Sequence, residues 1–166
     1  MPDMLVKLFE LPDVGPLRRD LLARGIEVRR AVSTEKRLVR AWVHEMFSAN
    51  WADECEVAFS NHPISCFIAT EHGRLIGFAC HDAFAYKNYF GPTGVSETHR
   101  SLGVGKALLV TCLEAMSMQG YAYGIIAWVG PAAFYTKAVG ATIIEGALPP
   151  IYHQLLPETH SGHHDG

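Results

Sequence analysis

The sequence predicts one α/β domain. Runs rich in β-branched and aromatic residues alternate with runs that carry apolar residues at helical spacing, which is the pattern of helices packed on a sheet. The length of 166 residues is typical of one domain and allows a full core without disulfide or metal staples. Hydrophobic residues make up 49% of the chain and charged residues 19%, which is the balance of a globular protein.

The first sixty residues predict two strands and three helices. Pro16 and Gly25 frame a short helix, and Ser33 is placed to cap a longer one whose apolar residues form two adjacent stripes, so that a broad face is buried. The strands are Leu5 to Phe9 and Ile26 to Val32; the helices are Pro16 to Arg24, a helix after Ser33 with the stripes Leu38, Trp42, Met46 and Val39, Val43, Phe47, and Asp53 to Ser60.

The rest of the chain predicts a hairpin, a distorted strand, a long helix, a strand, a short helix and a final hairpin. Tyr121 to Val129 is almost continuously apolar, which favours a central strand covered on both faces. The strands are Cys66 to Thr70, Leu75 to Asp82, Tyr89 to Val95, Tyr121 to Val129, Thr142 to Glu145 and Ile151 to Leu155; the helices are Val104 to Gln119 and Gly130 to Val139.

Charge and targeting signals narrow the function classes. Fourteen Lys and Arg against 17 Asp and Glu give a net charge of -3, which argues against binding nucleic acid or an anionic membrane through an overall basic field. The first ten residues lack the apolar run of a signal peptide, and Gly120 and Pro131 interrupt the uncharged stretch from Ala115 to Thr136. We therefore expect a cytoplasmic protein with no membrane segment.

Cysteine and histidine spacing predicts no metal site. Cys55, Cys66, Cys80 and Cys112 form no Cys-x-x-Cys pair, so we interpret them as reduced thiols in the core. His160, His163, His164 and Asp165 lie in a tail without apolar periodicity, where no scaffold would hold a metal geometry.

The segment from Val95 to Lys106 is the most informative one. It joins a strand distorted by Gly91, Pro92 and Gly94 to a long helix, through a loop that contains Gly103 and Gly105. Proline cannot donate to a ladder, so the strand must bulge or part from a neighbour. The first turn of a helix offers unpaired N–H groups and a partial positive charge, so this turn can hold a diphosphate.

Two common phosphate loops do not fit this segment. A dinucleotide-binding Gly-x-Gly-x-x-Gly needs glycine at the position of Leu108. A nucleoside-triphosphate loop around Gly105-Lys106 needs glycine at Arg100 and Ser or Thr at Ala107.

The segment resembles the acyl-coenzyme A loop of the GNAT acetyltransferase superfamily. In that pattern a strand-ending Val is followed after four residues by Arg or Gln-x-x-Gly-x-Gly or Ala, and Val95, Arg100, Gly103 and Gly105 match it. The order of elements from Ile26 to Leu155 is also similar. The resemblance implies a GNAT-type acyl-CoA N-acyltransferase fold, with a mixed, mostly antiparallel central sheet splayed at the cofactor site and flanked by helices. It divides the chain into an extension (1–25), the acetyltransferase domain (26–156) and a flexible tail (157–166).

The resemblance also implies the roles of individual residues, with acetyl-CoA as co-substrate. Gly94 and Val95 would contact the pantetheine arm between the parted strands, and one of their N–H groups could face the carbonyl oxygen. The diphosphate would be held by Arg100, Ser101, Leu102, Gly103, Val104, Gly105 and Lys106. The Asn that often follows the central strand in the family is absent, since Trp128, Val129 and Gly130 stand there.

For catalysis, the segment from Phe134 to Ala141 resembles the family's Phe-Tyr segment and implies Tyr135 as the acid that protonates the departing thiolate. It departs by one extra residue before Gly140 and by Ala141 in place of an aromatic. Glu97, Asp82 and His81 are candidates for the base; we name Glu97 as the catalytic candidate, although a loop carboxylate is more often a solvated or capping group.

The acceptor pocket implied by the family would be aromatic and partly acidic, which suits a small-molecule amine that carries a positive charge. Glu54 and Glu56 are nevertheless expected on a solvated face. Two alternatives to this enzyme are a non-catalytic acyl-CoA-binding module and an acetyltransferase that acts on a protein amino group. The sequence does not decide whether the chain forms a homodimer. The residues expected around the acceptor pocket are Trp42, Phe47, Trp51, Phe84, Tyr86, Tyr89 and Phe90, with Asp53, Glu54 and Glu56 nearby.

Overall fold

The computed structural model describes residues 1–147 and 155–157. A seven-stranded sheet runs in the order β2-β3-β4-β5-β6-β1-β7. Among the described strands, every neighbouring pair is antiparallel except β5 and β6. The strands are β1 (Met4–Lys7), β2 (Ile26–Arg30), β3 (Cys66–Glu71), β4 (Arg74–His81), β5 (Tyr89–Val95), β6 (Tyr123–Ile126) and β7 (Thr142–Ile143).

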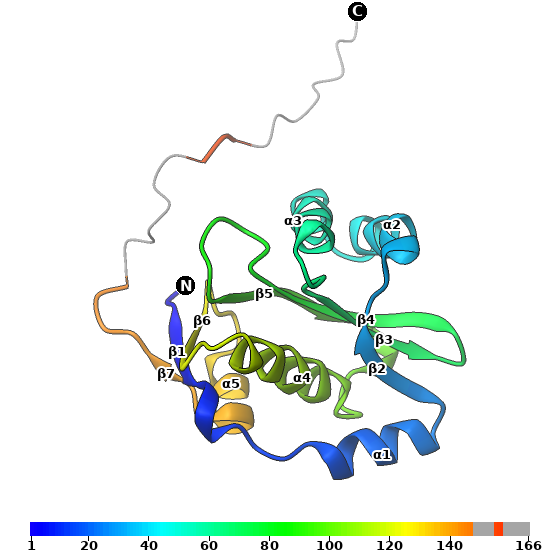
Figure 1. Ribbon diagram of the computed structural model, residues 1–166, viewed down its shortest axis with the longest axis horizontal. Coiled ribbons are helices and arrows are strands. Elements are labelled where there is room, and N and C mark those ends of the chain that lie inside the picture. Colours follow the sequence, from blue (N-terminus) through cyan, green and yellow to red (C-terminus); the bar gives the residue numbers. More distant parts are fainter. Residues whose placement is uncertain (148–154, 158–166) are drawn as a thin grey trace, which may run out of the picture.

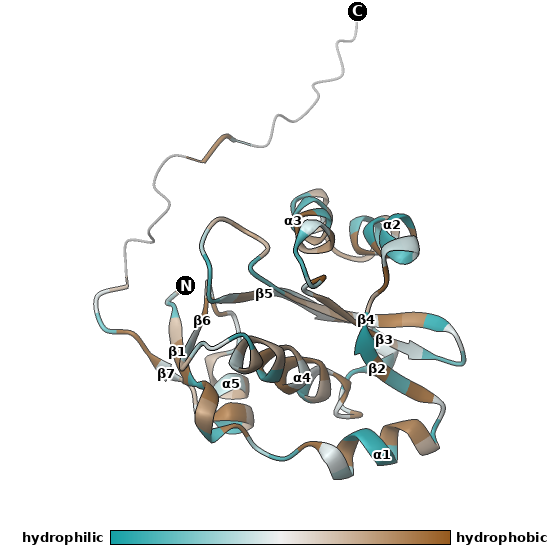
Figure 2. Cartoon of the chain, in the orientation of Figure 1, coloured by the Kyte–Doolittle hydropathy of each residue, from teal (hydrophilic) through white to brown (hydrophobic). Residues whose placement is uncertain are grey.

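Helices cover both faces of this sheet (Figure 1). On one face, α4 with α1 and α5 encloses a mostly aliphatic core cluster. On the other face, α2 and α3 enclose a second cluster that contains three cysteines and several aromatic rings. Figure 2 shows more hydrophilic residues on the visible side of α2 than on α4. The helices are α1 (Gly15–Ala23), α2 (Lys36–Met46), α3 (Ala49–Ser60), α4 (Val104–Met118) and α5 (Ala132–Val139).

The predicted distortion of the strand before α4 is confirmed. β5 pairs with β4 over most of its length, with a register shift before His81. It pairs with β6 only at Tyr89 and Phe90, opposite Ile125 and Ile126. Gly91 then adopts φ +122°, which favours glycine, and Pro92 has no N–H for a ladder. β5 and β6 therefore separate directly after Phe90.

The turn before α4 needs glycine at its last residue. Gly103 is the N-cap of α4 with φ +89°, and a Cβ there would lie 2.8 Å from a methyl group of Leu17. α1 thus packs directly under the turn. Arg18 holds α1 to α4 through Glu114, at 3.0 Å, and Thr111, at 2.8 Å.

The first 25 residues form part of the same sheet and core. β1 lies between β6 and β7, and Asp3 accepts a hydrogen bond from the Trp128 N–H at 3.0 Å. The Val129 N–H donates to the carbonyl of Pro2. The segment therefore supports the loop after β6.

Several predicted elements differ from the structure. The strand expected over Tyr121 to Val129 is limited to Tyr123–Ile126, and the chain bends at Trp128, where φ is +49°. Tyr123 is exposed, so this end of the strand is not covered on both faces. Leu38 and Met46 are also exposed, since the two stripes span a wider arc than the sheet covers. Ser33 lies in a 3-10 turn, and Glu35 accepts the Val32 N–H instead.

The helix expected from Asp53 begins at Ala49, where Ser48 caps it by accepting the Trp51 N–H. Of the final hairpin, β7 is present and pairs with β1. Residues 151–154 of the predicted second strand, and His160, His163 and His164 of the tail, lie outside the described residues. Within the described part of the chain, no helix has the length and apolar character needed to cross a bilayer.

Candidate active site

A cavity of about 680 Å³ passes through the gap between β5 and β6. We call it the β5–β6 cavity. Its lining comes from both faces of the sheet, which is possible only because the two strands separate. The lining residues are Met1, Ser48, Asn50, Trp51, Glu54, Phe84, Tyr89, Phe90, Gly91, Pro92, Thr93, Gly94, Val95, Arg100, Gly105, Leu109, Ile126, Ala127, Trp128, Val129, Gly130, Pro131, Phe134 and Tyr135.

One end of the cavity reaches the turn before α4. Arg100 and Gly105 line it, and the Arg100 Nε donates to the carbonyl of Val95 at 3.3 Å. The opening N–H groups of this 15-residue helix have no intrahelical acceptors, and the helix dipole adds positive potential there. An anion at this end would meet backbone N–H groups and a guanidinium together.

The predicted cofactor residues divide into two sets. Gly94, Val95, Arg100 and Gly105 line the cavity. Ser101, Leu102, Gly103, Val104 and Lys106 lie in the adjoining turn and first helical turn, outside that lining. Val104 is fully buried, so it can offer a ligand only its backbone.

Tyr135 lines the cavity from α5. Its ring lies edge-on to Phe90 and Phe134, and the residue is 7% exposed. Burial raises the pKa of Tyr135 to about 12. The phenol is therefore a protonated donor throughout the neutral range.

The structure corrects the expectation for Glu54. Glu54 lines the cavity from α3, and burial, with a smaller contribution from Cys55, raises its pKa to about 7. Glu56 does lie on the outer face as expected, where it pairs with Lys36 at 3.0 Å and Arg40 at 2.9 Å. Periodicity along α3 could have separated the two, because Trp51 and Glu54 are one helical turn apart and share a face.

The predicted candidates for the base lie elsewhere. The side chain of Glu97 is 85% exposed, 4.0 Å from Arg100, and is outside the cavity lining. His81 is fully buried, stacks on Phe67 and binds Asp82 at 2.9 Å. Asp82 also accepts the Asn88 N–H, so this pair shapes the loop after β4 and does not face the cavity.

Only some of the residues predicted for the acceptor pocket line the cavity. Trp51, Phe84, Tyr89 and Phe90 line the cavity, and Tyr86 packs on Tyr89. Trp42 and Phe47 pack instead on Phe78 in the core, and Asp53 pairs with Arg40. The Phe47 ring also explains Gly94, because a Cβ there would lie 2.4 Å from it.

Residues 32–141 match the model of the acetyltransferase (GNAT) family. The chain belongs to this family. The match includes Gly103, Gly105, Tyr135 and Glu54. The predicted fold, a mostly antiparallel sheet flanked by helices and splayed beside that turn, is the GNAT fold.

Solved structures support the GNAT fold at low sequence identity. The glucosamine N-acetyltransferase region of a fungal multi-domain GH3 β-N-acetylglucosaminidase aligns with TM-score 0.71 and 15% identity, over 86% of this chain and 19% of that one. A GCN5-related N-acetyltransferase from Sphaerobacter thermophilus aligns with TM-score 0.63 and 20% identity, over 86% of this chain and 48% of that one. A Drosophila protein aligns with TM-score 0.60 and 14% identity, over 86% of this chain and 47% of that one.

The chain spans less than half the length of each of these three structures. No curated protein matches the sequence. The family model and the solved structures show the family and the fold. The substrate and the mechanism have to be argued from the β5–β6 cavity.

Proposed function

We propose that this chain transfers an acetyl group from acetyl-CoA to a primary amine of a small molecule, by direct attack of the amine within a ternary complex. The observation that carries this proposal is the β5–β6 cavity, which joins the turn before α4 to α3 on the opposite face of the sheet. Acetyl-CoA supplies an acyl group activated as a thioester, and its diphosphate and acyl group lie at opposite ends of a long arm. A passage through the sheet suits such a molecule.

At the α4 end, the backbone from Arg100 to Lys106 would hold the diphosphate. Gly103 allows the backbone to turn into the helix, and the N–H groups of the first helical turn, which have no intrahelical acceptors, would bind the diphosphate. Arg100 adds a fixed positive charge at the same end.

In the middle of the cavity, Val95 is the better oxyanion donor of the two residues predicted. The Ser96 N–H bonds to the carbonyl of Ile76 in the β4–β5 ladder. Because N–H groups of an antiparallel strand alternate in direction, the Val95 N–H points away from β4, toward the gap. A donor facing the charge that develops on the carbonyl oxygen is worth about 3 to 4 kcal/mol.

Glu54 and Tyr135 approach the cavity from opposite faces, and the pKa of Tyr135 is the higher of the two, as an acid–base pair of this kind needs. With a pKa of about 7, Glu54 can accept the proton that an alkylammonium must lose before attack. With a pKa of about 12, Tyr135 keeps its proton for the departing thiolate. Glu54 thus replaces Glu97 as the proposed base, and Tyr135 keeps its predicted role.

The acceptor end favours a cationic amine. Trp51, Phe84 and Tyr89 provide aromatic faces, to which a cation is attracted, and Glu54 provides a carboxylate. The cavity is lined from both faces of the sheet, which favours a small molecule over a protein chain.

A pair of measurements separates this enzyme from a non-catalytic acyl-CoA-binding module. Calorimetry measures acetyl-CoA binding, and a thiol-release assay is run over a set of small amines. Acceptor-dependent thiol release is expected for the enzyme. Tight binding of acetyl-CoA without release by any amine would favour the binding module.

Tyr135→Phe tests the proposed acid. Loss of the donor is expected to lower kcat by about 100-fold or more, with the Kd for acetyl-CoA changed little. Tyr121→Phe is the matched control, because Tyr121 packs against the same core cluster and does not line the cavity. Wild-type turnover in Tyr135→Phe at every pH would remove Tyr135 from the mechanism.

A further inference from the structure

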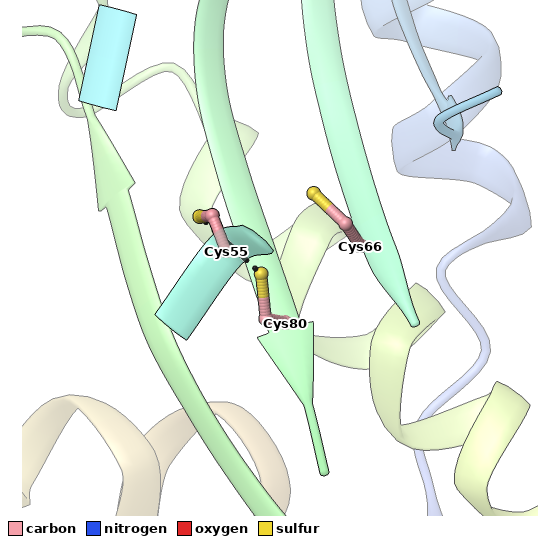
Figure 3. Close-up of side chains that lie close together, drawn as sticks. All are labelled: Cys55, Cys66 and Cys80. Atoms are coloured by element: carbon pink, nitrogen blue, oxygen red, sulfur yellow. Dashed lines mark hydrogen bonds between the residues drawn. The ribbon is translucent and has the colours of Figure 1, made fainter. Parts of the chain in front are cut away.

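Three thiols distant in the sequence meet beneath α3. Cys66 and Cys80 are register partners on β3 and β4, so their side chains lie next to each other on one face of the sheet. Cys55 reaches them from α3 (Figure 3). The three Sγ atoms all lie within 4.8 Å of one another, and those of Cys55 and Cys80 are 3.7 Å apart. We call this group the three-thiol cluster.

The cluster is closed to solvent and has apolar surroundings. Each of the three cysteines is 0% exposed, and their neighbours in the core are residues such as Ala52, Ala58 and Phe59. In the described part of the chain, no His, Asp, Glu or fourth Cys joins the group as a ligand. Any bound species must therefore be satisfied by three sulfurs alone.

The spacing of the sulfurs fits one shared soft atom. A soft atom binds thiolates at about 2.3 Å, so a pyramidal three-coordinate centre holds its sulfurs about 3.4 Å apart, closer than a trigonal-planar or tetrahedral centre does. The 3.7 Å between Cys55 and Cys80 is close to this spacing, and rotation of the Cys side chains would bring the other pairs in from separations of at most 4.8 Å. No change of register between β3 and β4 is needed.

Charge and ligand number select the kind of atom. Zinc almost always takes four ligands in a structural site, and three thiolates around it would leave a buried net charge of -1. Three thiolates around copper(I) would leave -2. An uncompensated charge in an apolar core is costly, whereas a trivalent, three-coordinate element such as arsenic(III) forms a neutral complex with three thiolates.

We infer that the three-thiol cluster is a binding site for a trivalent thiophilic species of the arsenous acid class. One As(OH)3 reacts with the three thiols. Three As–S bonds form, three As–O and three S–H bonds break, and three water molecules leave. Arsenic stays in the +3 state, so no oxidant or reductant is consumed. Arsenous acid is small and uncharged at neutral pH, so local opening of α3 suffices for its entry.

Occupation of the site would also affect the β5–β6 cavity, and this consequence rests on the proposed function. Cys55 follows Glu54 on α3, and Glu54 and Trp51 line that cavity. A bound atom would tie α3 to β3 and β4 and hold this wall in one position. We expect arsenite to slow acetyl transfer by the wild-type protein and to leave Cys55→Ala much less affected.

The binding test does not depend on any catalytic activity. The reduced full-length protein is incubated with sodium arsenite and examined by native mass spectrometry. The expected product is a single adduct that gains one arsenic atom and loses three hydrogens, with a rise in melting temperature because three elements are joined. An adduct that keeps a hydroxyl group on arsenic, and so uses only two thiols, would overturn the inference, as would no adduct.

Variants assign the adduct to the cluster. Cys55→Ala is expected to lose the three-thiol adduct. Cys80→Ala is a second variant with the same expected result, and circular dichroism checks that each variant folds. Cys112→Ala is the matched control, because Cys112 is equally buried but lies in the α4 core cluster. Loss of the adduct in Cys112→Ala, or its persistence in both other variants, would contradict the assignment. A zinc adduct formed in preference to arsenic would overturn the choice of ligand.

Discussion

The two faces of the sheet contribute to one cavity in different ways. On the α4 face, the site consists mainly of main-chain groups: the turn at Gly103, the first N–H groups of α4 and the parted backbone of β5. On the α3 face, it consists of side chains, chiefly Trp51 and Glu54. Contiguous residues encode the first kind of site, whereas tertiary packing assembles the second.

The largest effect is expected from removing the acidic side chain on the α3 face. Glu54→Gln keeps the shape of the side chain and removes the base, so kcat should fall by roughly 100-fold to 10,000-fold with acetyl-CoA affinity unchanged. The wild-type rate should rise with pH as Glu54 loses its proton near pH 7. Steady-state kinetics over pH 5.5 to 9 measures both.

Glu56→Gln is the control for this experiment, since Glu56 is two residues away on the outer face, paired with Lys36 and Arg40. It should keep the wild-type rate and pH profile. An equal loss in both variants would mean that α3 acts through its fold and not through the Glu54 carboxylate.

An intermediate effect is expected on the α4 face. Gly103→Ala would force a side chain into φ +89° and against Leu17, at 2.8 Å, at a cost of about 1 to 2 kcal/mol. The turn should shift, and the Kd for CoA should rise by about tenfold, which corresponds to about 1.4 kcal/mol. Isothermal titration calorimetry measures this change.

Gly120→Ala separates backbone strain from ligand binding. Gly120 has φ +98° with no atom within 4 Å of a Cβ, and it lies past the far end of α4. It should lose similar stability and keep the Kd for CoA. Equal weakening of CoA binding by both variants would show that the turn has no special role.

The extent to which the site was predictable follows the same division. The sequence alone predicted the distorted strand, the turn and α4, because the Gly-Pro interruption and the glycine spacing act within one short segment. The same residues identified the family, and Tyr135 was found through its neighbour Phe134. All of these signals are local.

The α3 face was predicted poorly because its signals are not local. Helical spacing separates Glu54 from Glu56, because Glu54 shares a face with Trp51, but the sequence does not show that this face lines a cavity. The three-thiol cluster depends on the register of Cys66 with Cys80, which spacings along the chain conceal. The exposed Leu38 and Met46 show the same limit, since a helical stripe does not state how wide the covering surface is.

The smallest effect concerns the stability of the α3 face. The folded protein holds the Glu54 proton more tightly than the unfolded chain does, because burial raises its pKa from 4.5 to about 7. The free energy of unfolding should therefore fall as the pH rises through this range. After allowance for partial exposure, Glu54→Gln should be more stable than wild type at pH 8, by on the order of 1 kcal/mol.

Urea unfolding at pH 5 and pH 8 measures this difference. A Gln variant that is less stable than wild type at pH 8 would show that the Glu54 carboxylate is well solvated. The base would then have to be sought elsewhere in the cavity.

The most direct measurement is a crystal structure of the protein with bound acetyl-CoA. We predict that its diphosphate lies on the N–H groups of residues 103–106, and that its arm runs between β5 and β6 with the acetyl group between Tyr135 and Glu54. A diphosphate bound elsewhere, or β5 and β6 paired beyond Phe90 with the arm outside the sheet, would contradict the account.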